Sequence, residues 1–353
     1  MISLNDLCWV LGEQDLGPLE LYFAKALKKN NLISAYHNIH SLYSSYWKNI
    51  SPYSHRFPRN FDNAVQKKYY SVINESVKRK YLSEKPSMIF IYNDCKILPE
   101  TIRFFRKNGS RVIVFLGDDP NYLFPNKKLF LLNVLEADYI VLPDTGWIDG
   151  LKMVGAENII YSPMGTDTDT FFKMTPDEND MKKFASDILF IGTGYFLNSW
   201  GLRRAEILNE LTGFNLKIFG DKLWYELFPY YPNLKKHFTC EPLSADKVNI
   251  ACNCSRIYPV AVNSGVVNGV STRIFDCIAS GIFVIAEYRK DLELFFDDSE
   301  IVYYRSKKEL KDKAEYFLKN EAEMREISEK ARNKVIENYT LEKSVKRILE
   351  QIN

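Results

Sequence analysis

The sequence has few cysteines and histidines, and this scarcity excludes several kinds of site. Six cysteines among 353 residues are too few for a disulfide framework. Cys252 and Cys254 lack the second pair or the nearby histidines of a zinc site. The four histidines show no H-E-x-x-H or similar spacing. We therefore expect ordinary reduced thiols and no metal role for the histidines.

Long apolar runs, excess charge and repeats are missing as well. No apolar stretch reaches the ~18 residues of a membrane span, and the first residues lack the basic and apolar regions of a signal peptide. The 47 Lys and Arg barely exceed the 45 Asp and Glu, so there is no basic footprint for nucleic acid. The sequence contains no repeat of fixed period and no low-complexity segment, so we expect neither a solenoid nor a disordered array. We expect a cytoplasmic globular protein that binds a small anion and no nucleic acid, with peripheral membrane contact left open.

The sequence does contain a regular alternation of apolar strands and helices. Strands are expected at residues 8–11, 88–92, 112–116, 140–142 and 159–161. Helices are expected between them at residues 18–27, 99–108 and 147–153, with glycines closing the last two. A second series of strands and helices runs from residue 188 to residue 304. Such alternation predicts parallel, doubly wound α/β sheets.

The chain divides into two expected domains and a helical tail. Residues 175–180 are polar and are typical of an interdomain linker, which places the boundary near residue 172. We expect an N-terminal Rossmann-like domain at 1–172 and a C-terminal one at 173–335. The charged tail, from residue 309 to residue 352, is expected to be helical throughout.

Residues 268–287 form the most informative segment, which is typical of a loop, a short helix, a closing glycine and a buried strand. Ser271 is a good N-cap, so the free amides of the next turn are expected to face an anion. Gly269 removes a Cβ that would block close approach. Arg273 supplies a forked donor for phosphate oxygens, and Asp276 can accept hydrogen bonds from a sugar diol. A diphosphate with a ribose is the ligand that fits this pattern.

This pattern resembles the C-terminal signature of GT-B glycosyltransferases, specifically the CgeB-like and group 1 branch. The likeness continues through most of the chain, in the same order, at residues 85–91, 98–103, 111–120, 138–144, 188–193 and 216–220. It implies two Rossmann-like domains facing across a cleft, with the nucleotide sugar on the C-terminal domain and the acceptor on the N-terminal one. It also implies that the last helix, 336–353, packs back on the N-terminal domain. Related transferases hold the donor with two acidic residues eight positions apart, and here Asn268 and Asp276 occupy these positions.

The resemblance extends to further donor-binding residues. Gly192 and Thr193 follow an expected strand and could bring backbone amides to the diphosphate, and Gly220 follows the next strand. Arg204 matches an arginine that would neutralise the leaving phosphate. Since helix termini and arginines usually meet this charge in the fold class, we expect no metal and no cofactor apart from the donor sugar nucleotide. The D-x-D-like run at 167–169 lacks further converging oxygen ligands.

Three aspartates are the candidate catalytic residues, because each follows an expected strand of the N-terminal domain: Asp118, Asp94 and Asp15. Asp118 is favoured as the base if the enzyme inverts, whereas retention needs no protein base. The spacing of Asn268 and Asp276 favours retention. The alternative interpretation is that such aspartates cap helices or form turns, that Arg273 makes a structural ion pair and that Asp276 is solvated.

The expected activity is transfer of a sugar from a nucleoside diphosphate to a hydroxyl of a glycan, a glycoconjugate or a protein. An aromatic cluster could line the acceptor groove or pack beneath a loop: Tyr36, Tyr43, Tyr46, Trp47, Tyr53, Phe57 and Phe61. A sugar-nucleotide epimerase on the same scaffold is one alternative, although the required acids and histidine are not assembled. A non-catalytic spore-surface or assembly protein is the other, and the amide at Asn268 motivates it.

Overall fold

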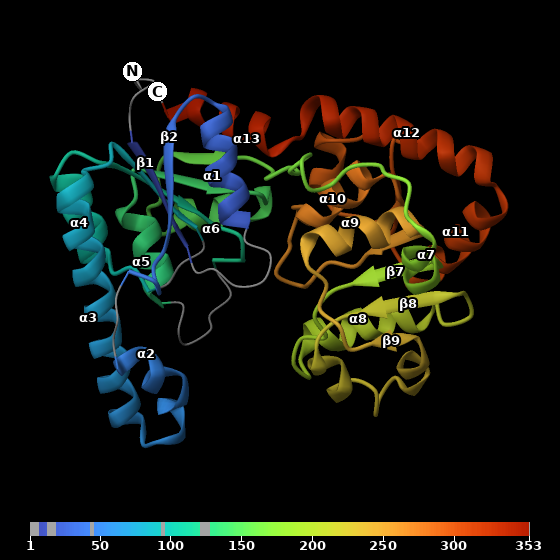
Figure 1. Ribbon diagram of the computed structural model, residues 1–353, viewed down its shortest axis with the longest axis horizontal. Coiled ribbons are helices and arrows are strands. Elements are labelled where there is room, and N and C mark those ends of the chain that lie inside the picture. The colour runs from blue at the N-terminus through green and yellow to red at the C-terminus, as the bar shows by residue number, and fades with distance from the viewer. Residues whose placement is uncertain (1–6, 13–18, 43–45, 93–95, 121–127, 353) are drawn as a thin grey trace. The chain divides into compact units, whose positions relative to one another are not determined.

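The computed structural model contains two compact α/β units (Figure 1), and it describes residues 7–12, 19–42, 46–92, 96–120 and 128–352. Unit 1 comprises Met1–Pro143, Trp147–Ser162 and Val345–Asn353. Unit 2 comprises Asp144–Gly146 and Pro163–Ser344. Each unit contains one six-stranded parallel sheet, which confirms the expected doubly wound α/β class.

The sheet of unit 1 has the strand order β2-β1-β3-β4-β5-β6. Its strands are β1 (Leu7–Gly12), β2 (Ile33–Asn38), β3 (Met88–Tyr92), β4 (Arg111–Phe115), β5 (Tyr139–Leu142) and β6 (Ile159–Tyr161). All neighbouring strands pair in parallel, and the order reverses between β1 and β3. The strands are apolar because helices cover both faces, as is usual for parallel sheets.

Helices of very different lengths follow and connect these strands. They are α1 (Leu19–Lys29), α2 (Tyr46–Ile50), η1 (Ser51–Arg56), α3 (Arg59–Glu84), α4 (Pro99–Lys107), α5 (Lys128–Glu136), η3 (Thr145–Trp147) and α6 (Ile148–Met153). Helix α4 begins with Pro99 in its first turn and closes at Gly109, whose φ of +93° favours glycine. The core beneath the helices includes Trp9, Tyr81 and Phe105, all buried.

The sheet of unit 2 has the strand order β12-β11-β10-β7-β8-β9. Its strands are β7 (Ser186–Ile191), β8 (Leu216–Phe219), β9 (Phe238–Thr239), β10 (Ser255–Val260), β11 (Phe283–Glu287) and β12 (Val302–Tyr304). This is the order of a dinucleotide-binding Rossmann sheet, and it reverses between β7 and β10. Ligands of open α/β sheets bind outside the carboxyl ends of the strands at such a switch point.

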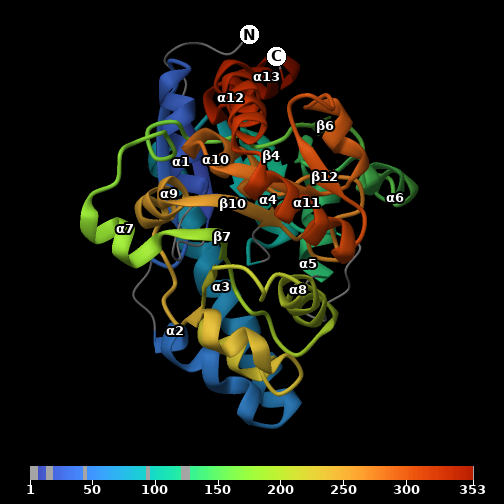
Figure 2. The same cartoon turned by 90° about the vertical axis from the view of Figure 1, so that its right-hand side faces the viewer.

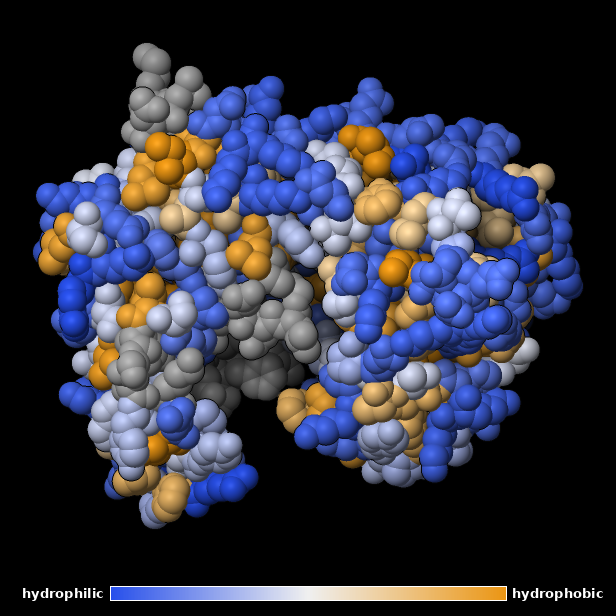
Figure 3. All heavy atoms as spheres, viewed as in Figure 1, coloured by the Kyte–Doolittle hydropathy of each residue, from blue (hydrophilic) through white to orange (hydrophobic). Residues whose placement is uncertain are grey.

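Helices cover both faces of this second sheet. They are α7 (Glu178–Phe184), α8 (Ser199–Asn209), η4 (Lys222–Glu226), η5 (Pro232–His237), α9 (Ala245–Cys254), α10 (Thr272–Ser280), η6 (Lys290–Leu294), α11 (Lys307–Lys319) and α12 (Glu321–Asn338). Most of the last helix, α13 (Leu341–Ile352), belongs to unit 1. Helices α8 and α11 share one apolar cluster with the sheet, and Figure 2 shows α9 on the opposite side of β7 and β10 from α8. The outer surface of α11 and α12 is polar, as Figure 3 shows.

The division between the units falls at Ser162 and Pro163, ten residues before the expected boundary at 172. The segment after Pro163 is held by unit 2, because Phe172 N donates to Asn249 Oδ1 at 3.0 Å and Met174 N donates to Asn253 Oδ1 at 2.8 Å. The polar residues 175–180, expected as a linker, include the start of α7 instead. Asp177 caps that helix through Asp180 N at 2.8 Å.

The C-terminal tail is helical but not continuous, since it breaks near Asn320 and again near Tyr339. The second break pairs with Thr166, in the segment of unit 2 that follows Pro163. Thr166 N donates to Tyr339 O, and Leu341 N donates to Thr166 O. Val345–Asn353 groups with unit 1, where Arg111 Nη1 donates to Ile352 O at 2.6 Å. The described cysteines are free thiols.

Candidate functional site

A cavity of about 210 Å³ opens at the carboxyl ends of β7 and β10, where the strand order of unit 2 reverses. Five of the residues expected to bind the donor line it: Gly192, Thr193, Arg204, Ser271 and Arg273. They come from the loop after β7, from α8 and from the first turn of α10. Residues that are up to 81 positions apart in the sequence therefore converge on one hollow at the edge where open α/β sheets bind ligands.

The recorded backbone pairing of β7 with β10 ends before the strand ends that border the cavity. The recorded pairing of these strands ends with Ile188 and Ile257, two residues before Pro259. Proline has no N–H to donate and is unusual inside a central strand. The hydroxyl of Tyr258 takes the place of backbone hydrogen bonds between β10 and β7. It accepts a hydrogen bond from Ile191 N at 3.2 Å and donates one to Ile191 O at 2.9 Å. This side chain ties the strands together beyond the end of that pairing and forms part of the cavity wall.

The amino end of α10 faces this cavity, as the sequence predicts. Ser271 has the extended conformation of an N-cap, and its Oγ accepts a hydrogen bond from Arg273 N at 3.3 Å. Gly281 closes the helix with a φ of +92°. Ser271, Thr272 and Arg273 all line the cavity. The positive end of the helix dipole therefore favours an anion there.

Arg204 adds a second, firmly held positive charge. Its Nη1 donates to Thr193 O at 2.6 Å. Its guanidinium carbon lies 4.4 Å from the centre of the Tyr195 ring and 5.2 Å from that of Phe190. Aromatic faces attract cations, so both rings hold the group in place. No other hydrogen bond is made by this guanidinium within the described residues, which leaves N–H groups for a phosphate.

The loop that carries Tyr195 is fixed by Asp221, which the sequence analysis did not single out. Asp221 accepts hydrogen bonds from the hydroxyl of Thr193, from Gly194 N at 3.1 Å and from Leu223 N at 3.1 Å. Tyr195 follows with a φ of +57°, a conformation that non-glycine residues rarely adopt. This strained residue places its ring beside Arg204, as expected where backbone strain serves a site.

Arg273 and Asp276 lie one turn apart on α10. Arg273 Nη1 is 3.9 Å from Asp276 Oδ2, and Thr166 Oγ1 donates to Asp276 Oδ1 at 2.9 Å. The Asp276 side chain is 17% exposed. Burial raises its pKa to about 6, although Arg273 and Thr166 act in the opposite direction. Asp276 is not in the wall of the cavity, so its contact with a sugar diol stays a prediction.

Asn268 is positioned by buried acidic residues. Its backbone N donates to Asp144 Oδ1 at 2.9 Å, and its Nδ2 donates to Thr145 Oγ1 at 3.0 Å. Its carbonyl accepts from Asp291 N at 2.9 Å, while Asp291 Oδ2 accepts from Thr145 N. Asp144 and Asp291 are each 1% exposed. These two acids were given no role from the sequence, and the tertiary contacts reveal that they order the loop before α10.

The two remaining glycines of the expected donor site pack against protein atoms. Gly269 is buried and does not line the cavity. A Cβ on Gly220 would lie 2.4 Å from Gly192 O and 2.5 Å from Trp224 Nε1. Gly220 thus permits close packing beneath the loop after β7, and a direct contact with the donor stays a prediction.

A buried carboxylate at the end of β11 orders two more arginines. Glu287 is 4% exposed, and its Oε2 accepts from Val262 N at 3.1 Å. Arg203 pairs with its Oε1, and Arg289 Nη1 lies 3.1 Å from the same oxygen. Two cations on one carboxylate leave an excess positive charge at the carboxyl edge of the sheet.

The expected catalytic aspartates are only partly described. Asp15 and Asp94 lie outside the described residues. Asp118 follows β4 and is half-buried. Burial raises the pKa of Tyr92, at the end of β3, and the carboxylates of Glu20 and Asp118 raise it further. Glu20, from α1, is therefore a second acid at this edge that the sequence analysis missed.

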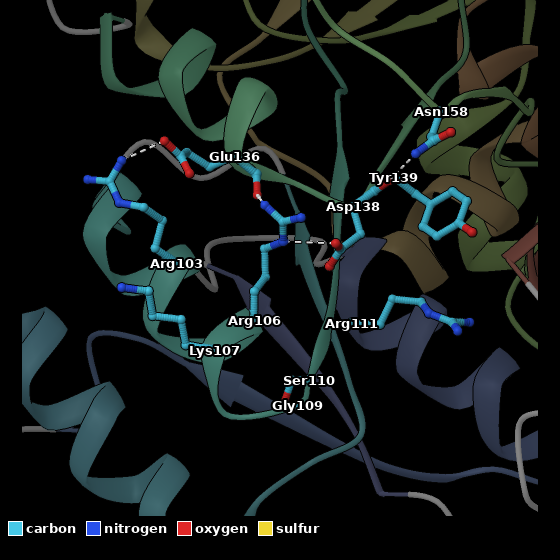
Figure 4. Close-up of a pocket in the computed structure, with 10 residues that line it drawn as sticks. All are labelled: Arg103, Arg106, Lys107, Gly109, Ser110, Arg111, Glu136, Asp138, Tyr139 and Asn158. Carbon is cyan, nitrogen blue, oxygen red and sulfur yellow. Dashed lines mark hydrogen bonds and ion pairs between the residues drawn. The ribbon is translucent and has the colours of Figure 1, made fainter.

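A larger cavity of about 710 Å³ lies in unit 1, at the amino ends of β4 and β5 (Figure 4). Arg103 Nη1 donates to Glu136 Oε1 at 2.6 Å, and Arg106 Nε donates to Asp138 Oδ1 at 2.8 Å. These cations already have carboxylate partners, and the strand ends at which open α/β sheets bind ligands lie at the other edge. We therefore place no substrate there.

Further expectations concern a metal ion, the acceptor groove and membrane spans. Among the described residues, no three His, Cys, Asp or Glu side chains lie close enough to hold a metal ion. Asp167, of the D-x-D-like run, accepts from the hydroxyl of Thr170 at 2.7 Å.

Four of the aromatic residues of the expected acceptor groove are exposed: Tyr46, Tyr53, Phe57 and Phe61. Tyr36 and Trp47 are half-buried, and Tyr43 lies outside the described residues. No helix in the described part of the chain is both long and apolar enough to cross a bilayer.

Comparison with known proteins gives a partial family match and a set of similar folds. The model of a family described as glycosyl transferase-like matches residues 203–350, which covers most of the site. No curated relative matches the chain.

Solved structures resemble the whole chain. Sucrose-phosphate synthase from Thermosynechococcus elongatus superposes with a TM-score of 0.68 at 11% identity, over 98% of both chains. The Anabaena protein HepE in complex with UDP-glucose superposes with a TM-score of 0.63 at 10% identity, over 98% of this chain and 99% of its own. The E. coli trehalose-6-phosphate protein bound with UDP-2-fluoro glucose gives 0.68 at 11%, over 98% of both chains. At this identity the likeness shows the fold, which is that of the GT-B glycosyltransferases.

Proposed function

We propose that this protein is a glycosyltransferase that moves a sugar from a nucleoside diphosphate to a hydroxyl acceptor. The observation that carries the proposal is the convergence of the α10 amino end, Arg204 and Arg273 on one cavity at the switch point of unit 2. The match of residues 203–350 to a glycosyl transferase-like family supports it. So does the likeness to HepE, which was solved with UDP-glucose.

The proposed chemistry follows from the charges of the cavity. When the bond between the sugar and the diphosphate breaks, negative charge develops on the leaving phosphate. Fixed donors aimed at such charge stabilise the transition state more than the ground state. Arg204 is fixed by two aromatic rings and Thr193 O, and the amides of α10 are fixed by the helix, so these groups need no reorganisation. Transfer without a metal ion is part of this proposal.

The proposal extends to the stereochemistry and to the acceptor side. The spacing of Asn268 and Asp276 favours retention of configuration, in which no protein base is needed. If the reaction inverts, Asp118 and Glu20 are the described acids at the strand ends of unit 1 from which a base could come. The acceptor is a hydroxyl of a glycan, a glycoconjugate or a protein, and the CgeB-like branch stays part of the proposal.

A nucleotide-sugar panel tests the function. The protein is incubated with UDP, GDP and TDP sugars, and thermal stabilisation and nucleotide release are measured. Transfer is supported if one sugar nucleotide stabilises the protein and its nucleotide is released slowly. The variants Arg204→Gln and Arg273→Gln should then lose both effects. Conversion of one sugar nucleotide to its epimer without nucleotide release identifies an epimerase. No response to any nucleotide indicates a non-catalytic assembly protein. This alternative is suggested by the amide of Asn268, which stands where related transferases have an acidic residue.

A further inference from the structure

The projecting end of unit 1 carries an exposed group of aromatic side chains. Helix α2, η1 and the first turn of α3, residues 46–62, form this aromatic tip (Figure 1). Its rings are unusually open to solvent: Tyr46 is 74% exposed, Tyr53 57%, Phe57 55% and Phe61 49%. Figure 3 shows the tip at the lower left as a projection with orange side chains among blue ones. Exposed apolar groups gathered in this way mark an interaction surface.

The tip is built with its polar groups inside and its aromatic rings outside. Ser51 and Ser54 are buried, and Ser54 Oγ donates to Asp62 Oδ1 at 2.5 Å. Gln66 joins the same network, because its Nε2 donates to Ser51 O and to Ser54 Oγ, each at 3.0 Å. These hydrogen bonds hold η1 on α3 without help from the outer rings. The aromatic side chains are therefore not needed to form the local core.

The rings and the charges of the tip fit a particular kind of surface. The rings of Phe57 and Phe61 lie 5.1 Å apart at 57°, and Arg56 lies 5.4 Å from the centre of the Tyr53 ring. Arg56 and Arg59 are exposed, whereas Asp62 is bonded to Ser54 and half-buried. The tip thus presents apolar rings, tyrosines and positive charge together. This combination suits the headgroup region of an anionic bilayer, where phenyl rings insert, tyrosines stay at the interface and arginines meet lipid phosphates.

We propose that the aromatic tip docks unit 1 on the surface of an anionic lipid bilayer. A sugar is a poorer occupant, because the two phenylalanine rings offer it no hydrogen bonds and the tip projects instead of forming a hollow. The inference rests on the tip alone and is independent of the donor cavity of unit 2. One apolar segment and two arginines give reversible binding that weakens with salt.

Vesicle sedimentation of the full-length protein tests the proposal. Vesicles of phosphatidylcholine alone are compared with vesicles of equal parts phosphatidylcholine and phosphatidylglycerol. We expect binding to the mixed vesicles and much less to the neutral ones. Phe57→Ser/Phe61→Ser should reduce the partition coefficient by roughly tenfold or more, because two phenyl groups no longer leave water. Arg56→Gln/Arg59→Gln should reduce it on the mixed vesicles and remove most of its salt dependence.

A matched control lies on the same helix. Leu82, near the other end of α3, is 56% exposed, so Leu82→Ser removes a similar apolar side chain outside the tip and should leave binding unchanged. Circular dichroism and thermal unfolding check that the variants fold. Absence of binding to mixed vesicles, or equal binding by the double phenylalanine variant, overturns the proposal. Concentration-dependent self-association that this variant abolishes also overturns it, since the occupant would be a second copy of the chain.

Discussion

Replacing Asp276 with asparagine should change how the stability of the protein depends on pH. Burial raises the pKa of this carboxyl from 3.8 to about 6 in the folded protein. Between these values the folded state binds more protons than the unfolded state, so the free energy of unfolding falls as pH rises through this window. The shift of about two units corresponds to about 3 kcal/mol, since one unit is worth ~1.4 kcal/mol. The ionised side chain therefore destabilises the wild-type protein at neutral pH.

The Asp276→Asn variant lacks this titration but can still accept the hydrogen bond from Thr166. Relative to the wild type, its free energy of unfolding should increase by about 2 kcal/mol between about pH 4 and about pH 8, as integration of the proton-linkage relation gives. Urea unfolding of both proteins across this range measures the difference. A difference that is the same at both ends of the range would show that the pKa is not raised, and the reasoning would fail.

Asp297→Asn is the control of opposite sign. Hydrogen bonds from the Ser299 side chain and backbone lower the pKa of Asp297, so its contribution to stability is present at neutral pH and is lost as pH falls. The two variants should therefore change the pH profile in opposite directions. Thr166→Val removes a hydrogen bond to the Asp276 carboxylate and should raise the pKa of Asp276 further. The pH range over which the free energy of unfolding falls should then extend to higher pH.

Three further predictions concern the donor cavity. Arg273→Ala should weaken nucleotide binding by ~1.5–3 kcal/mol, the usual value of a hydrogen bond to a charged group, and calorimetry showing unchanged affinity would remove this residue from the site. Tyr195→Leu should weaken binding by about 0.5–2 kcal/mol through loss of the ring beside Arg204, whereas Tyr195→Phe should retain it; equal affinities for both variants would contradict the cation–π role. Gly194→Ala should lower the thermal midpoint, at a cost of ~1–3 kcal/mol, because its Cβ would lie 2.4 Å from Trp224 N, while Gly213→Ala, with open space around it, should leave the midpoint nearly unchanged.

Local signals in the sequence are sufficient to predict the donor helix. Ser271 at the N-cap, Gly281 at the closing position and an apolar strand after it determine α10 and β11 by capping and periodicity alone. Arg204 was placed at the donor by resemblance, and the structure brings it to the same cavity. These features depend on neighbours within a few residues or on a shared motif order, so one sequence contains them.

The supporting residues could not be predicted because they act across the fold. Asp221 lies outside the segments that carry the family resemblance, whereas Glu287 and Asp144 lie within them but were given no role. Each of the three accepts a hydrogen bond from a backbone amide of a loop distant in sequence. The domain boundary was misplaced for a related reason. Polar residues 175–180 have the composition of a linker, but Asp177 uses that polarity to cap α7 inside unit 2.

Several departures from local rules gather around one cavity in unit 2. Pro259 lies inside a central strand, Tyr195 takes a conformation that favours glycine, and Asp276 carries a carboxyl that burial destabilises in its charged form. Each feature costs stability, although positive φ angles at non-glycine residues also occur away from the cavity, at Asn31, Lys85 and Asn158. Strained features that persist together are expected where function requires them. Tyr195 lines the cavity, Pro259 stands between the lining residues Tyr258 and Val260, and Asp276 lies one helical turn from the lining Arg273, so the three features together support a ligand site there.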